Sequence, residues 1–184
     1  TWVADKGNGT YQNPVLHADY SDPDICAAGD DFYMTASSFN CIPGIPILHS
    51  NDLVNWSLVN YALPVQEPES FFDKAQHGKG VWAPAIRFHN GEFYIYWGDP
   101  DYGIYMIKTK DPKGKWSKPV LVKAGKGMID ATPLWDEDGK VYLIHAYAGS
   151  RSGVNSILVI CELNPEGTEV ISDPVMVFDG NDGK

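Results

Sequence analysis

The chain has 184 residues, which is long enough for one domain with a sizeable buried core. Its formal net charge of −10 argues against binding nucleic acid or an anionic membrane surface, because both depend on Lys and Arg side chains, whereas a neutral saccharide is compatible with it. An aromatic content of 12% with 18 Gly and 13 Pro favours many short strands joined by turns, and no apolar run is long enough to cross a bilayer.

Targeting and cofactor signals are weak in this sequence. Residues 1–6 lack the charged start and apolar stretch of a signal peptide. A mature secreted chain would look the same, so a secreted or periplasmic location is favoured while the compartment stays open. The 3 Cys and 5 His show neither a disulfide framework nor metal-ligand spacing. We therefore expect no metal and no cofactor.

The strongest feature along the chain is an internal repeat. Each copy is a short strand, a turn containing Gly, and an aromatic strand, and the copies cover residues 21–35, 82–96 and 131–143. A second hairpin follows each copy. Four strands per unit, with unit lengths near the ~40–50 residues of known blade repeats, are typical of a β-propeller. Aromatic residues at equivalent positions are expected in the core between blades: Tyr33, Tyr94 and Tyr142.

The repeat predicts an all-β fold with blades at roughly 13–65, 78–125 and 126–180. Propellers close with about four to eight blades, and three blades would leave apolar faces open. We therefore expect residues 1–184 to be the N-terminal part of a single propeller domain. Its remaining blades, absent from this chain, are then its partners.

Candidate catalytic residues stand at the start of each repeat. In a propeller the first strand of each blade lines the central channel, so equivalent residues converge on the axis. Asp22, Trp82 and Asp130 occupy this position. Taken singly, Asp22 before a Pro is explained as a turn residue, Asp130 as a loop end and Trp82 as blade packing. Their shared position in the repeat favours function: two carboxylates and an apolar plate suit glycoside hydrolysis.

His77 precedes Trp82 in a loop and is the last candidate. A solvent-exposed loop histidine is the simpler interpretation, and a residue bordering the sugar pocket is the alternative.

Several motifs, in order and spacing, resemble the opening of glycoside hydrolase family 43. The similarity runs roughly from residue 13 to residue 177. The motifs are Asn13-Pro14-Val15-Leu16, Asp22-Pro23-Asp24-Ile25, Ser37-Ser38-Phe39, Gly44-Ile45-Pro46-Ile47-Leu48-His49-Ser50, Gly80-Val81-Trp82-Ala83-Pro84-Ala85-Ile86-Arg87 and Ile129-Asp130-Ala131-Thr132-Pro133-Leu134-Trp135.

This resemblance implies a five-bladed propeller, of which the chain supplies about the first three blades, and an inverting β-xylosidase or α-L-arabinofuranosidase activity. It implies Asp22 as general base and Asp130 as the carboxylate that tunes and orients the general acid. It also implies that Trp82 and Phe39 form walls of the sugar subsite. The acid of the family is a Glu in a Glu-Gly-Pro motif opening blade four. That motif does not occur here, since Glu166-Gly167 is followed by Thr168.

The sequence therefore favours hydrolysis of glycosidic bonds in xylan, arabinoxylan or arabinan. One alternative is a non-catalytic carbohydrate-binding propeller that keeps the aromatic pocket and lacks the acid. A weaker alternative is a propeller scaffold for protein partners, against which the carboxylates of the channel argue.

Overall fold

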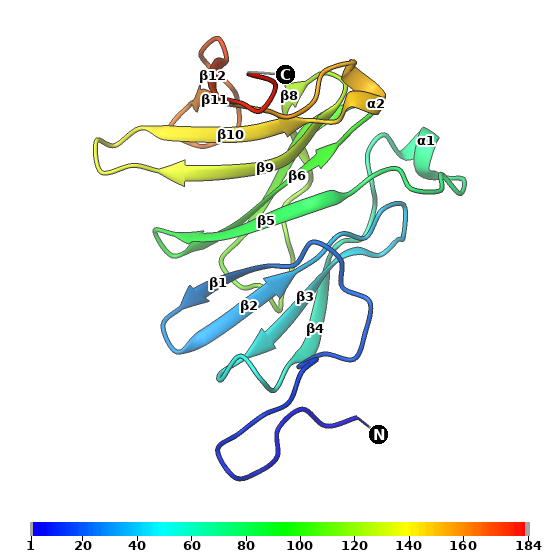
Figure 1. Ribbon diagram of the computed structural model, residues 1–184, viewed down its shortest axis with the longest axis vertical. Coiled ribbons are helices and arrows are strands. Elements are labelled where there is room, and N and C mark those ends of the chain that lie inside the picture. The colour runs from blue at the N-terminus through cyan, green and yellow to red at the C-terminus, as the bar shows by residue number, and fades with distance from the viewer. Residues whose placement is uncertain (1, 183–184) are drawn as a thin grey trace.

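The computed structural model describes residues 2–182, which fold into three four-stranded sheets (Figure 1). The first sheet contains β1 (Asp24–Ala28), β2 (Asp31–Thr35), β3 (Gly44–Ser50) and β4 (Ser57–Leu63). The second contains β5 (Trp82–His89), β6 (Glu92–Asp99), β7 (Gly103–Thr109) and β8 (Val120–Ala124). The third contains β9 (Met128–Trp135), β10 (Val141–Tyr147), β11 (Ile157–Leu163) and β12 (Val175–Asp179). Two short helices are α1 (Glu69–Phe72) and α2 (Gly149–Ser152).

Each sheet is an antiparallel meander whose strands follow in chain order. The turns between strands carry residues suited to them. Asn90 and Gly91, between β5 and β6, have φ values of 48° and 79°, which a tight hairpin turn requires. The all-β class and the four-strand unit expected from the repeat are therefore confirmed. Neither helix in residues 2–182 is long and apolar enough to span a membrane.

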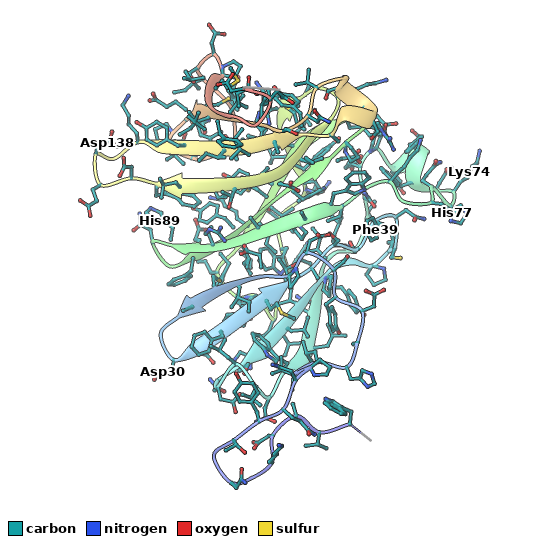
Figure 2. The ribbon with its side chains drawn as sticks, in the orientation of Figure 1. Asp30, Phe39, Lys74, His77, His89 and Asp138 are labelled. Carbon is teal, nitrogen blue, oxygen red and sulfur yellow. The ribbon has the colours of Figure 1, made fainter. Side chains whose placement is uncertain are left out.

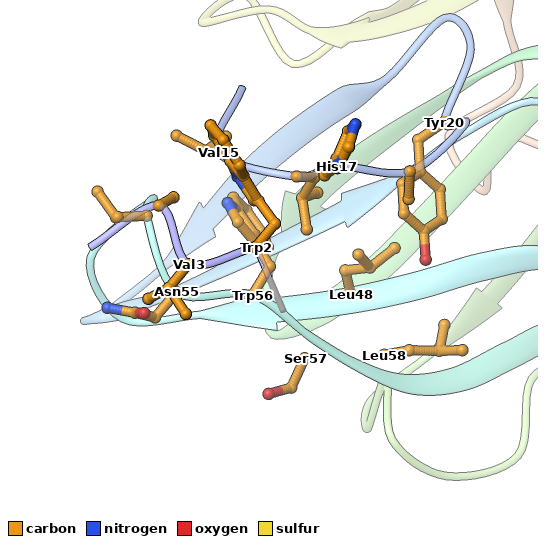
Figure 3. Close-up of a pocket in the computed structure, with 14 residues that line it drawn as sticks. Trp2, Val3, Val15, His17, Tyr20, Leu48, Asn55, Trp56, Ser57 and Leu58 are labelled. Carbon is orange, nitrogen blue, oxygen red and sulfur yellow. The ribbon is translucent and has the colours of Figure 1, made fainter. Parts of the chain in front are cut away.

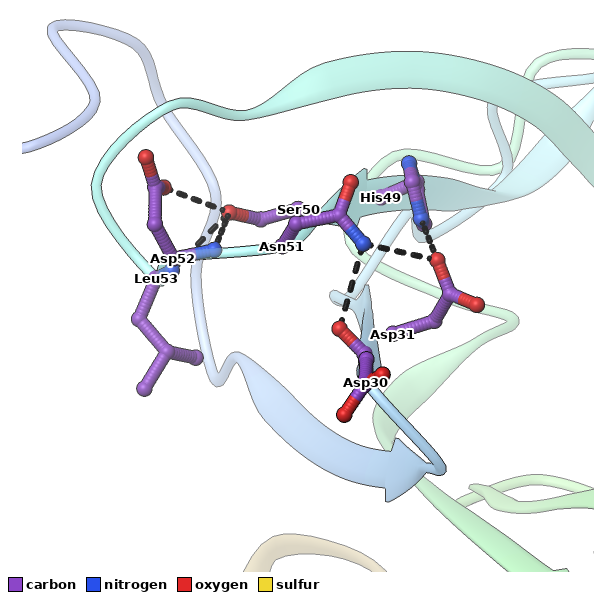
Figure 4. Close-up of polar contacts among 7 residues, drawn as sticks. All are labelled: Asp30, Asp31, His49, Ser50, Asn51, Asp52 and Leu53. Atoms are coloured by element: carbon purple, nitrogen blue, oxygen red, sulfur yellow. Dashed lines mark hydrogen bonds and ion pairs between the residues drawn. The ribbon is translucent and has the colours of Figure 1, made fainter.

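The loop between β3 and β4 is held by its own polar side chains (Figure 4). Ser50 Oγ accepts a hydrogen bond of 2.9 Å from the Leu53 amide, and Asn51 Nδ2 donates to Asp30 O and Asp31 Oδ1. His49 pairs with Asp31. These contacts satisfy backbone and side-chain groups that the sheet does not pair.

The core consists of two apolar layers, one on each face of the second sheet. The layer shared with the first sheet includes Tyr33, Ile95 and Trp97. The layer shared with the third includes Tyr96 and Leu143. Because β6 has a neighbouring sheet on both faces, seven of its eight residues are buried.

Two of the three repeat tyrosines lie in these layers as expected. Tyr33 and Tyr94 are each 7% exposed, whereas Tyr142 is only half-buried. Tyr142 lies on the third sheet, and no further sheet covers its outer face within residues 2–182. The outer strand of that sheet is also apolar and exposed. Its exposed side chains are Val175, Met176, Val177 and Phe178, each more than half exposed.

The first strands lie side by side, with β1 against β5 and β5 against β9. Gly98 on β6 allows the second and third sheets to approach each other. A Cβ atom at Gly98 would lie 2.6 Å from Met128 O and 2.8 Å from Ile129 Cα. The backbone just before Asp130 thus depends on the absence of a side chain at Gly98.

We predict that Gly98→Ala lowers the free energy of unfolding by about 1–3 kcal/mol, because the added methyl group overpacks backbone that cannot rotate away. Thermal and urea unfolding would measure the change. Gly149→Ala is the matched control, since its Cβ would meet only the Asn155 side chain, at 3.3 Å or more. We expect this variant to unfold with the same free energy as the wild type. Equal losses in both variants would contradict the packing argument.

Candidate active site

A residue of left-handed backbone conformation lies within two residues of the start of each first strand. Asp22, Ala83 and Asp130 have φ values of 50°, 38° and 57°. Such values are uncommon outside glycine and cluster at functional sites. Each residue stands four positions before the strand residue that pairs with the repeat tyrosine: Cys26 with Tyr33, Arg87 with Tyr94, and Leu134 with Tyr142. The three positions are therefore structurally equivalent.

This equivalence corrects one expectation. Ala83, and not Trp82, occupies the position of Asp22 and Asp130. The repeat itself gives this pairing, because residues 82–96 follow residues 21–35 without a gap and set Ala83 on Asp22. Ala83 and Asp130 also share a bulge, since the register shifts in the same way between β5 and β6 and between β9 and β10. Trp82 therefore lies one residue before the position that carries the carboxylates.

Asp22 and Asp130 line one open hollow of about 230 Å³ where the three sheets meet. The backbone of β5 forms its middle wall. Deeper polar residues from the three first strands complete it: Asp24, Arg87 and Thr132. The structure thus brings the two candidate carboxylates together although 107 other residues separate them in the sequence, from position 22 to position 130.

Ser37 fixes the orientation of Asp22. Its hydroxyl donates a hydrogen bond of 2.7 Å to Asp22 Oδ2, and it accepts one of 2.8 Å from the Ala83 amide. The Ser37 amide also donates to Ser21 O at 3.0 Å. One carboxylate oxygen of Asp22 is therefore engaged. The other oxygen, Oδ1, faces no donor among the hydrogen bonds of residues 2–182.

Arg87 joins all three sheets below the carboxylates. Its guanidinium pairs with Asp24 of β1 and donates a hydrogen bond of 2.7 Å to Thr132 Oγ1 of β9. The Ile86 amide donates to the same Asp24 carboxylate at 2.8 Å. This network fixes the depth and spacing of the strand starts.

The environment of Asp130 makes its carboxyl group harder to ionise. Desolvation by surrounding protein raises its pKa above the ordinary value, and the negative charge of Asp22 raises this pKa further. The side chain nevertheless keeps contact with solvent. A carboxyl group that is harder to ionise than its neighbour is suited to a different role from that neighbour.

Trp82 precedes Ala83, a residue in the wall of the hollow, and Phe39 pairs with Val81, the residue before Trp82. The Phe39 amide donates to Val81 O at 3.1 Å and the Val81 amide donates back at 3.3 Å. Phe39 is 37% exposed and Trp82 is half-buried, with its indole N–H donating to Gly78 O at 2.9 Å. Neither ring is among the residues that line the 230 Å³ hollow itself.

His77 is exposed in the turn before Trp82. Figure 2 shows it on the same side of the molecule as Phe39, whereas His89 and Asp138 lie at the opposite ends of the strands. It does not line the hollow, so its position fits the simpler interpretation of a solvated loop residue.

Glu166 lies far from these carboxylates. It belongs to the turn after β11, at the end of the third sheet opposite to the start of β9. The adjacent Gly167 carbonyl accepts a hydrogen bond of 2.6 Å from the Tyr96 hydroxyl and holds this turn against the second sheet. Glu166 is therefore not placed to act with Asp22.

Larger hollows occur beside the first sheet. One of about 660 Å³ lies between the N-terminal segment and the first sheet, with Trp2, His17, Tyr20 and Trp56 on its walls (Figure 3). No carboxylate lines it. An adjoining hollow of about 730 Å³ has mainly apolar walls. Chemistry, and not size, therefore identifies the candidate site.

In residues 2–182 no group of three or more His, Cys, Asp or Glu is arranged to hold a metal ion.

Comparison with known proteins decides the family. The model of the family "Glycosyl hydrolases family 43" matches residues 11–183. The chain belongs to glycosyl hydrolase family 43. It is 36% identical to a beta-xylosidase of Formosa agariphila, over 96% of this chain and 31% of that protein. It is 37% identical to a non-reducing end alpha-L-arabinofuranosidase of Bacteroides ovatus, over 78% of this chain and 28% of that protein.

Solved structures of the family agree with this fold. The crystal structure of the GH43 protein BlXynB from Bacillus licheniformis superposes with a TM-score of 0.76 at 32% identity, covering 92% of this chain and 34% of that one. The expected fold, three blades of the five-bladed propeller of family 43, is thereby confirmed. The chain spans about a third of the length of these curated relatives and structures.

Sequence reasoning missed the residues that hold the candidate site together. Ser37 stood in a motif but was not singled out, and its bond to Asp22 joins segments 15 residues apart. Arg87 offered a clearer signal. An arginine within an otherwise apolar strand needs a buried partner, and the two remaining acidic and hydroxyl residues of the first strands, Asp24 and Thr132, supply it.

We predict that Asp22→Asn lowers the pKa of Asp130, because the substitution removes a negative charge that disfavours ionisation. A carboxyl-carbon NMR titration of Asp130 would measure the shift. Asp136→Asn, in the turn at the opposite end of β9, is the control and should leave the Asp130 pKa unchanged. If the pKa of Asp130 were unchanged in Asp22→Asn, the charge of Asp22 would not affect the ionisation of Asp130.

Proposed function

We propose that this family 43 chain supplies the general-base side of the active site of an inverting glycoside hydrolase. The observation that carries the proposal is the pair of carboxylates, Asp22 and Asp130, at equivalent strand starts and on one hollow. The aromatic residues Trp82 and Phe39 beside it supply the apolar walls for a sugar ring. Its substrates are pentose-containing oligo- and polysaccharides such as xylan, arabinoxylan or arabinan, in line with the xylosidase and arabinofuranosidase relatives.

Asp22 is the general base in this mechanism. Ser37 holds its Oδ2 atom, so Oδ1 is left to accept a proton from water. As the water oxygen bonds to the anomeric carbon, its proton passes to Asp22. The bond from that carbon to the leaving oxygen breaks on the opposite face, where the leaving oxygen takes a proton from the general acid. This single displacement inverts the configuration and requires carboxyl groups about 6.5–9.5 Å apart.

Asp130 acts on the general acid in this proposal. A nearby negative charge raises the pKa of a carboxylic acid and keeps it protonated near neutral pH. Asp130 also offers oxygens that can hold the acid in place. Two unprotonated aspartates could not themselves donate the proton that the leaving oxygen needs, so the acid is a third group.

We propose that this acid and the remaining blades belong to the same propeller. The exposed apolar strand β12 and the apolar hollow beside β1 are the two faces that neighbouring blades would cover. The alternative, a non-catalytic carbohydrate-binding propeller, lacks support from the glycosidase relatives. Whether the coding sequence continues into a Glu-Gly-Pro motif distinguishes the two.

We predict that Asp22→Asn in the complete propeller lowers kcat by roughly 10²–10⁴-fold or more with little change in folding, because the shape is kept and the base is lost. Hydrolysis of aryl β-xyloside and aryl α-arabinofuranoside would measure it, with ¹H NMR of the first-formed anomer reporting inversion. Asp136→Asn serves as the control. Turnover of Asp22→Asn near wild type would remove Asp22 from the base role.

Asp130→Asn should lower kcat. It should also shift the alkaline limb of the pH profile, which reports the general acid, towards lower pH. The reason is that removing a neighbouring negative charge lowers the pKa of that acid. The pH dependence of kcat/KM measures this shift. A fall in kcat with an unchanged profile would contradict the electrostatic role.

We predict that residues 1–184 expressed alone neither hydrolyse pentosides nor persist as a stable monomer. The acid is missing, and the open faces of the first and third sheets favour association. Activity assays and sedimentation velocity test both halves. A soluble monomer that releases pentose would overturn the claim and point to an acid within this chain.

A further inference from the structure

A charged cluster surrounds Trp82, and its members come from both the second and the third sheets. Arg151, on α2 of the third sheet, places its guanidinium carbon over the Trp82 ring, 5.9 Å from the ring centroid. Its Nε atom donates a hydrogen bond of 3.0 Å to Asp101 Oδ1 in the turn between β6 and β7. The same residue thus contacts the indole and an acidic turn of the second sheet.

The other side of this acidic turn is held by the loop that precedes Trp82. Lys79 Nζ lies 3.8 Å from Asp101 Oδ2 and 4.9 Å from the ring centroid of Phe71 on α1. The neighbouring residue Gly78 accepts the hydrogen bond of the Trp82 indole N–H at 2.9 Å. The edge of the indole is therefore fixed by the loop, and one of its faces is covered by Arg151.

The ion pair of Arg151 with Asp101 is partly buried. The side chains of Arg151 and Asp101 are 29% and 20% exposed. The adjacent Asp99 is 1% exposed, and burial raises its pKa to about 6. An acidic turn removed from water in this way requires nearby cations, and Lys79 and Arg151 provide them. The cluster is accordingly a specific arrangement and not a solvated patch.

We propose that Arg151 is a positioning residue for Trp82, so that a helix of the third sheet sets the orientation of an aromatic sugar platform carried by the second. The inference rests on the proposed role of Trp82 in sugar binding. With its edge bonded to Gly78 and one face against the guanidinium, the indole has its other face for a pentose ring. Asp101 holds Arg151 in place and does not itself contact the sugar.

The test compares Arg151→Met, Trp82→Ala and the double variant in the complete propeller. Methionine keeps the length of the side chain and removes both the cation and its hydrogen bonds. We expect Arg151→Met to raise KM for an aryl pentoside roughly threefold to tenfold while kcat changes less than twofold, in keeping with the size of a cation–π contact. In the Trp82→Ala background the same change should have no further effect on KM. Arg151→Lys, which keeps the positive charge, should restore part of the loss.

Lys140→Met is the matched control, because Lys140 forms a comparable ion pair of 3.0 Å with Glu162 at the opposite end of the third sheet. Its KM should equal that of the wild type. If Arg151→Met lowers the melting temperature so far that it cannot be assayed, Asp101→Asn replaces it. Asp101→Asn must then raise KM in the wild-type background and have no further effect on KM in the Trp82→Ala background.

Equal increases of KM in the presence and absence of Trp82 would overturn the inference and leave the proposed function intact, because Arg151 would then act independently of the indole. A fall in kcat with unchanged KM would also overturn it. A wild-type propeller that does not hydrolyse pentosides would overturn the proposed function, and this inference with it.

Discussion

The salt bridge of Arg87 is the contact on which the geometry of this molecule depends. One guanidinium on the middle sheet pairs with Asp24 of the first sheet and bonds to Thr132 of the third. Arg87 and Asp24 are each about one-third exposed, so losing either partner would leave a partly buried charge without compensation. Apolar packing holds the sheets face to face, but it is not directional. The directional bonds of Arg87 set the register in which the three strand starts meet.

The repeat predicted the sheets, their strand number and the convergence of Asp22 and Asp130, because blade architecture follows from local patterns of turns and aromatic residues. It misplaced Trp82 by one residue. The gap-free alignment of residues 82–96 with residues 21–35 pairs Ala83 with Asp22, but the indole of Trp82 is the more conspicuous residue at the start of that copy. The repeat also missed Ser37 and Arg151, whose partners on the second sheet, Ala83 and Asp101, lie 46 and 50 residues away. Contacts of that kind arise only after the sheets have packed, and no local pattern records them.

Acidic groups gather at one end of the sheets, and two of them are harder to ionise than an ordinary aspartate. Desolvation raises the pKa of both Asp99 and Asp130, and in each case a neighbouring aspartate raises it further. Cations are placed where they can offset this cost at Asp101 and Asp24. None of the groups that raise or lower the pKa of Asp130 is a cation. The protein thus places cations beside the acids that support the fold and leaves Asp130 exposed to the charge of Asp22.

Asp22 lies at the first sheet, whereas Asp130, which in the proposed mechanism holds the general acid in place, lies on the third, and this division links stereochemistry to packing. In glycoside hydrolases the distance between the two reacting carboxyl groups decides whether configuration is inverted or retained. When these groups stand on separate sheets, the distance between them depends on the angle at which the sheets pack and on how far each group lies from the axis. A substitution in the apolar layers, remote from any sugar, can therefore change the room left for the attacking water and slow the displacement. The catalytic rate would then be a property of the hydrophobic core.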